Sequence, residues 1–142
     1  MHIIYTDGSY TTNNPGVVGW GFCSADKTLE GHGSFNAKNN PHDIISGRQI
    51  GGEIKATMEA ILAAKRAGHK EITICHDYEG VEKWATGQWK RKKHYTQVYH
   101  QWMQSMMREL TITFRKVASK DNLADEYARI DTGAPDAHKY DK

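Results

Sequence analysis

A helix followed closely by a buried strand constrains the fold of this chain more than any other feature. Its apolar positions recur at helical spacing, at Ile50, Ile54, Met58, Ile61 and Leu62. Several alanines raise the helix propensity of this segment, and Gly68 ends it. Residues 71–76 then have the apolar content of a buried strand. A helix over 50–67 leading directly into such a strand predicts an α/β domain.

The rest of the chain extends this pattern on both sides. Strands are predicted at 3–6, 17–24 and 29–35, the three of them antiparallel, with turn residues from Asp7 to Ser9 and a polar loop over 36–49. A short helix around Val81 should end near Gly87. A second helix carries an apolar stripe of Val98, Trp102, Met106 and Leu110. A strand over 111–117 precedes a last helix that Asp121 or Asn122 would cap and that runs to Arg129.

The length and composition fit one ordinary domain. The 142 residues suffice for a single core, so we expect one domain over 1–142, with a flexible tail after about residue 131. No apolar run approaches the ~18 residues of a membrane span, and we see no signal peptide. We therefore expect a cytoplasmic protein. Cys23 and Cys75 lie in strand-like apolar segments and should be buried, reduced thiols.

Two aspartates follow predicted strands directly. Asp7 comes after the first strand and Asp77 after the strand at 71–76. If those strands are neighbours, the two carboxylates converge, and they repel each other unless a cation lies between them. Such pairs often bind hard divalent cations such as Mg²⁺. The alternative is that both residues only cap or form turns.

The sequence favours one further carboxylate and leaves another open. On the helix, Glu53 lies beside the apolar stripe, whereas Glu59 lies with Lys55 on the charged side, where a surface ion pair is expected. Gly51 and Gly52 would let a backbone or a ligand approach closely. In the last helix, Leu123, Tyr127 and Ile130 define a face from which Asp125 points away. Periodicity therefore does not choose among Asp125, Asp121, Glu126 and Asp131.

A dense basic segment, Lys90–Lys93, lies among aromatic residues. The net charge of +2 is too small to indicate nucleic acid by itself, so this local cluster matters more. The cluster comprises Lys90, Arg91, Lys92 and Lys93, with Trp89 beside it. The lysines could contact phosphates while Trp89 packs on a sugar or base. The alternative is that the lysines form a solvated loop. Trp84 and Trp102 are expected to be structural residues of the core in either case.

Four short motifs together resemble the type 1 ribonuclease H family, which cuts the RNA strand of RNA/DNA hybrids. They are TDGS at 6–9, GGEIKA at 51–56, HDYEGV at 76–81 and ADEYAR at 124–129. The segment 79–97 further resembles a bacterial subgroup often joined to a viroplasmin-like hybrid-binding domain. The resemblance implies the ribonuclease H-like fold, a mixed five-stranded sheet flanked by helices.

The resemblance also implies a site. Asp7, Glu53, Asp77 and Asp125 would bind two Mg²⁺ ions about 4 Å apart, with Mn²⁺ as a substitute, and give 5′-phosphate and 3′-hydroxyl products. Gly8 and Glu53 would contact the 2′-hydroxyl of the RNA strand. The other expected substrate contacts are Ser9, Asn14, Gln49, Glu79, Trp89 and the segment Lys90–Lys93. No protein partner is indicated, and we expect a monomer.

The chain departs from the family in one functional loop. The family usually has a histidine before the fourth aspartate, but residues 117–122 contain none, and Lys120 is nearest that place. Lys120 is therefore a candidate electrostatic substitute. Two other functions stay open at this point. One is a nuclease of the same fold with another nucleic-acid substrate, and the other is a non-catalytic hybrid-binding module.

Overall fold

Five strands form one mixed sheet in the order β3-β2-β1-β4-β5. The computed structural model describes residues 2–10, 16–36 and 49–132. The strands are β1 (His2–Tyr10), β2 (Val17–Ser24), β3 (Glu30–Asn36), β4 (Glu71–His76) and β5 (Thr111–Lys116). The first three pair antiparallel, whereas β4 pairs parallel with both β1 and β5. This topology confirms the predicted mixed sheet.

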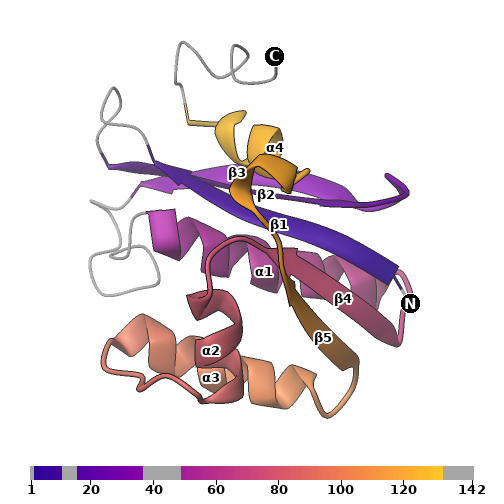
Figure 1. Cartoon of the computed structure of the whole chain (residues 1–142), viewed down its shortest axis with the longest axis vertical. Coiled ribbons are helices and arrows are strands. Elements are labelled where there is room, and N and C mark those ends of the chain that lie inside the picture. Colours follow the sequence, from indigo (N-terminus) through magenta and orange to yellow (C-terminus); the bar gives the residue numbers. More distant parts are fainter. Residues whose placement is uncertain (1, 11–15, 37–48, 133–142) are drawn as a thin grey trace.

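Helices cover both faces of the sheet. They are α1 (Gln49–Arg66), α2 (Gly80–Thr86), α3 (His94–Met106) and α4 (Asp125–Arg129), and a short 3-10 helix, η3 (Ser119–Asp121), precedes α4. Figure 1 shows α4 on one face and α1 on the other, with α2 and α3 beyond α1. Among the described residues, no helix has the length and hydropathy of a membrane-spanning segment.

The core lies between α1 and the centre of the sheet. Ile54 and Ile61 of α1 pack with Ile4 of β1 and Ile72 of β4, and all four are fully buried. Each such side chain contributes about 1.5–3 kcal/mol relative to an exposed one. The predicted helix and its neighbouring strand are thus confirmed. Cys23 and Cys75 are buried and free, as predicted.

Two predictions about local structure were wrong. The first strand does not end before Asp7, because β1 continues to Tyr10 through backbone pairing with β2, where Asp7 lies opposite Gly21. Pairing along a neighbouring strand outweighs the turn preference of Asp7, Gly8 and Ser9. In α3, Val98 is 40% exposed, against the prediction, whereas Met106 is buried as predicted, together with Tyr95, Tyr99 and Met103. The helix turns its aromatic residues to the core because they bury more area.

The last helix also differs from the prediction. Neither Asp121 nor Asn122 is its N-cap, since α4 begins at Asp125 after the separate 3-10 helix. Leu123 and Ile130 are exposed, and the buried face consists of Ala124 and Ala128. This small face packs on glycines of β2, because a Cβ at Gly19 would overlap the backbone of Ala128 and one at Gly21 would lie 2.5 Å from its nitrogen. Backbone contact, and not a large apolar stripe, therefore holds α4 on the sheet.

Candidate metal centre and nucleic-acid interface

The end of β4 creates the opening in which three carboxylates meet. β1 pairs with β4 only as far as Tyr5 opposite Cys75, while β1 continues along β2. Asp7 therefore lies on β1 beyond the last β4 partner, and Asp77 follows the end of β4. Near Asp77, Nδ1 of His76 lies 2.9 Å from the carbonyl oxygen of Tyr78, which supports the turn. The sheet itself brings the two aspartates together.

Glu53 reaches the same opening from α1. The preceding Gly52 lies so close to the sheet that a Cβ there would overlap the Gly19 carbonyl oxygen and lie 3.2 Å from Gly8 Cα. The glycine thus admits a backbone, one of the two alternatives that the sequence left open. Glu59, in contrast, pairs with Lys55 at 3.0 Å on the solvent side, as predicted.

The three carboxylates form a compact and largely buried cluster. Asp7, Glu53 and Asp77 each offer an oxygen, and these oxygens lie within 4.8 Å of one another. Asp7 is 4% exposed and Glu53 is 3% exposed. An Asp7 oxygen accepts a hydrogen bond from the Gly8 amide at 2.9 Å, but no N–H or hydroxyl group of the described residues donates to either buried oxygen of Glu53. A buried acid without a donor is costly, which indicates that a ligand completes its surroundings.

The electrostatics of the cluster point to a cation. Burial raises the pKa of Asp7, and the neighbouring charges of Asp77 and Asp125 raise it further. Burial also raises the pKa of Glu53, with Asp7 and Asp77 adding to the effect. The raised pKa values of Asp7 and Glu53 show that negative charge is unfavourable in the metal-free cluster. A divalent cation among the oxygens would stabilise the ionised carboxylates and lower these pKa values. Carboxylate oxygens suit hard cations such as Mg²⁺, so the residues present fit such an ion.

Asp125 lies beside this cluster but is not part of the compact group. With Asp7, Asp77 and Arg129 it lines a cavity of about 190 Å³, to which Gly8, Ser9, Tyr10 and Ser119 also contribute. Both of its oxygens face Arg129, at 3.2 Å from Nε and 3.3 Å from Nη2. The structure therefore brings the predicted fourth carboxylate to the site while pairing it with a cation of its own helix.

Asn122 is a site residue that the sequence analysis missed. Its side-chain nitrogen donates to an Asp77 oxygen and to the Thr6 carbonyl, each at 2.9 Å, and its side-chain oxygen accepts from the Ala124 amide at 3.0 Å. Asn122 is only 5% exposed. It thus fixes Asp77, β1 and the start of α4 relative to one another. From the sequence, Asn122 was predicted only as a possible helix cap.

Comparison with solved structures identifies the architecture. The N-terminal RNase H domain of a Mycobacterium tuberculosis protein, solved as a fusion with maltose-binding protein, superposes with a TM-score of 0.74 at 22% identity, covering 99% of this chain and 98% of that one. The chain has the ribonuclease H fold. RNase H1 of the halophilic archaeon Halobacterium salinarum gives a TM-score of 0.68 at 24% identity, with 89% and 96% covered.

A third solved structure of this fold contains nucleic acid. LC11-RNase H1 in complex with an RNA/DNA hybrid gives a TM-score of 0.71 at 20% identity, covering 93% of this chain and 96% of that one. No family sequence model matches the chain, and neither does any curated protein sequence. At these identities the likeness shows the ribonuclease H fold.

The remaining predicted contact residues are spread around the site. Gly8 and Ser9 line the cavity, but the Ser9 hydroxyl also donates to the Ala128 carbonyl oxygen and so ties β1 to α4. Glu79 is exposed at the start of α2. Lys120 is exposed on η3, and its neighbour Ser119 lines the cavity instead. Asn14 and the side chain of Gln49 lie outside the described residues.

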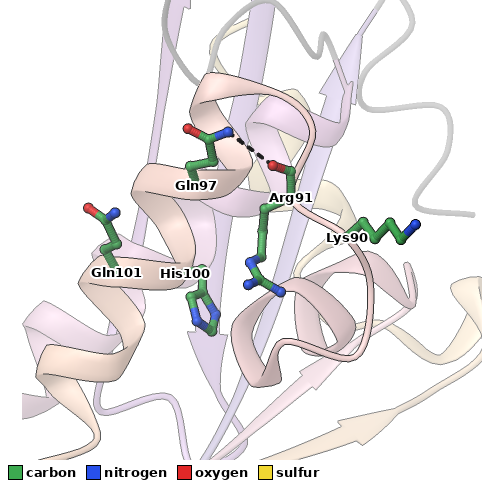
Figure 2. Close-up of a pocket in the computed structure, with 5 residues that line it drawn as sticks. All are labelled: Lys90, Arg91, Gln97, His100 and Gln101. Carbon is green, nitrogen blue, oxygen red and sulfur yellow. Dashed lines mark hydrogen bonds between the residues drawn. The ribbon is translucent and has the colours of Figure 1, made fainter.

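The basic segment borders a second cavity. Lys90 and Arg91 line a space of about 380 Å³ together with Gln97, His100 and Gln101 of α3 (Figure 2). The guanidinium of Arg91 donates to the carbonyl oxygens of Gly87 and Trp89, each at 3.2 Å, so Arg91 holds its own loop together. Lys90, Lys92 and Lys93 are exposed.

Aromatic rings pack against one another beside the basic segment. The Trp89 ring packs edge-on against Trp84 and Tyr78, with centroids 5.5 Å and 6.2 Å away. Tyr78 directly follows Asp77 in the chain. Trp84 and Trp102 pack against the core, as predicted. Trp89, which precedes the basic segment, therefore packs on the residue that follows Asp77.

Proposed function

We propose that this chain is a divalent-metal-dependent endonuclease that hydrolyses the RNA strand of RNA/DNA hybrids and leaves 5′-phosphate and 3′-hydroxyl ends. The unpartnered, buried carboxylate of Glu53 beside Asp7 and Asp77 carries this proposal. A hybrid-binding module without catalysis would gain nothing from negative charge concentrated where phosphates approach. The buried acids are best explained by cations that contact both protein and phosphate.

Each carboxylate has a distinct part in this proposal. Asp7, Glu53 and Asp77 would hold the first Mg²⁺, and Asp7 with Asp125 would hold a second. Two Mg²⁺ ions held by these residues would supply an activated water and would stabilise the leaving 3′ oxygen. Asn122 keeps an Asp77 oxygen in place through its hydrogen bond. Gly8 lines the cavity, and its backbone would contact the 2′-hydroxyl.

The choice of a hybrid substrate rests on three observations of different kinds. The motifs TDGS, GGEIKA, HDYEGV and ADEYAR resemble the type 1 family. The fold matches LC11-RNase H1, which was solved with an RNA/DNA hybrid. The exposed lysines at 90, 92 and 93 follow Trp89, whose ring packs on Tyr78 next to Asp77 in the chain, and they would contact the DNA strand. We also propose Ser9, Asn14, Gln49 and Glu79 as contacts, with Lys120 near the leaving group.

Cleavage of a labelled hybrid with and without Mg²⁺ tests the proposal. The wild-type chain should cut the RNA strand only with the metal, and Glu53→Gln should abolish cutting because it removes a metal ligand from the buried cluster. Glu59→Gln is the matched control, since Glu59 lies on the same helix but pairs with Lys55 at the surface. Equal activity of the two variants would refute the proposed site.

The same assay separates the other nucleases of this fold. Hybrid, duplex DNA and duplex RNA of one sequence are compared at equal concentration. Preferential cleavage of the RNA strand in the hybrid is the expected result. Preferential cleavage of duplex DNA would show that the site acts on a different class of substrate. Binding of the hybrid without cleavage in Mg²⁺ or Mn²⁺ would show that the chain is a binding module and not an enzyme.

A further inference from the structure

Arg129 forms an ion pair with Asp125, the proposed site carboxylate that stands apart from the compact cluster. Its Nε and Nη2 each meet a different oxygen of Asp125, at 3.2 Å and 3.3 Å. Planar guanidinium and carboxylate groups match in this two-pronged arrangement, which is stronger and more specific than a single contact. Asp125 thus already has a cation before any metal arrives.

The placement of Arg129 is more than a surface ion pair. Arg129 and Asp125 both line the cavity that Asp7 and Asp77 border, and their side chains are 30% and 39% exposed. The helix that carries them is fixed to β2 by backbone contact at Gly19 and Gly21. Because α4 cannot easily shift, the way to free Asp125 is rotation of the Arg129 side chain.

We propose that Arg129 is an internal counter-cation that must leave Asp125 before a second divalent ion can bind. This inference rests on the proposed function, because it assumes that the first ion occupies Asp7, Glu53 and Asp77. Binding of the two ions is then unequal. The first ion fills a cluster that contains no cationic side chain, whereas the second displaces a bound guanidinium and is repelled by its charge.

Simple electrostatics give the size of the effect. A divalent ion and a unit charge about 5–6 Å apart in water interact strongly enough to change an affinity roughly tenfold. The effect weakens as salt is added, since charges at this separation are partly screened. Removal of the Arg129 charge should therefore tighten the second site roughly tenfold in low salt and leave the first site nearly unchanged.

Titration of the metal-free full chain with Mn²⁺ measures both sites without nucleic acid or catalysis. In the wild type we expect one tighter and one weaker class of bound Mn²⁺. Arg129→Gln should tighten only the weaker class, while Arg129→Lys, which keeps the charge, should stay within about threefold of the wild type. Lys55→Gln removes the same charge from a surface pair of the same spacing and should change neither class.

The outcomes separate this inference from the proposed function. If Arg129→Gln leaves the weaker class unchanged, or shifts both classes equally, Arg129 is not a counter-cation for the second metal. Tightening by Arg129→Lys equal to that of Arg129→Gln would also overturn the inference, because the charge would not be the cause. Absence of any bound Mn²⁺ in the wild type would instead refute the proposed function. Arg129→Met repeats the test with an apolar stem if Arg129→Gln does not fold.

Discussion

Replacement of Glu53 by glutamine should stabilise the metal-free protein while it removes the proposed activity. Glu53 is 3% exposed, and within the described part of the chain no N–H or hydroxyl group donates to either of its buried oxygens. Burial and two neighbouring aspartates raise its pKa to about 10 from the ordinary 4.5. At pH 7, protonation of the buried group therefore costs the folded state about 3 kcal/mol, at about 1.4 kcal/mol per pH unit.

Glutamine avoids this cost because it carries no charge and has nearly the same shape. Imperfect hydrogen bonding of the buried amide costs about 1 kcal/mol, so the free energy of unfolding should rise by about 2 kcal/mol. For a domain of this size that gain corresponds to a melting temperature higher by roughly 5–10 °C. Glu59→Gln, the control, should shift stability by less than about 0.5 kcal/mol because it removes only an exposed ion pair.

Thermal unfolding in a chelator, and again in excess Mg²⁺, tests this reasoning. Without metal, Glu53→Gln should melt above the wild type. With Mg²⁺, the wild type should gain stability by mass action while the variant gains little, so the difference narrows or reverses. If the metal-free variant melts at or below the wild-type temperature, Glu53 is not a buried group that awaits a cation, and the argument fails.

Three further predictions concern the surroundings of the cluster. The free energy of unfolding of the metal-free wild type should fall as pH rises from about 5 to 8. Burial raises the pKa of Asp7 in the folded state to about 8. In this pH range the folded chain therefore binds more protons than the unfolded chain. Urea unfolding at a series of pH values with a chelator measures this, and a flat or rising profile would contradict it. Asn122→Ala should cost about 2–3 kcal/mol and raise the Mg²⁺ concentration needed for half-maximal activity, because it leaves the Thr6 carbonyl and the Ala124 amide without their partner. An unchanged urea midpoint would show that these bonds contribute little. Gly21→Ala should destabilise the chain by about 1–3 kcal/mol and lower hybrid cleavage, since its Cβ would lie 2.5 Å from the Ala128 nitrogen; full activity would mean that α4 adapts without moving Asp125.

The sequence predicted elements whose signal is local and periodic. The helix at 50–67 and the strand at 71–76 have strong apolar patterns, and both occur where predicted. The same periodicity separated Glu53 from Glu59, because the two residues face different surroundings on one helix. Pairing partners were harder to predict. Asp7, Gly8 and Ser9 are turn-forming residues in isolation, and only pairing with the neighbouring β2 keeps this segment extended.

Asp125 shows why the fourth carboxylate could not be found from residue patterns alone. A periodic pattern reveals a helix with a large apolar face. No such face of α4 lies against the sheet, because the buried residues are only Ala128 and the N-cap residue Ala124. The complementary surface consists of Gly19 and Gly21, about a hundred residues away in the chain. Neither the alanines nor the glycines alone therefore reveal the contact in the sequence. Small residues on both sides let two backbones approach closely, and that approach sets where Asp125 stands relative to Asp7. A carboxylate placed by backbone contact keeps its position whether a guanidinium or a metal ion neutralises it, which is what an exchange of one cation for another requires.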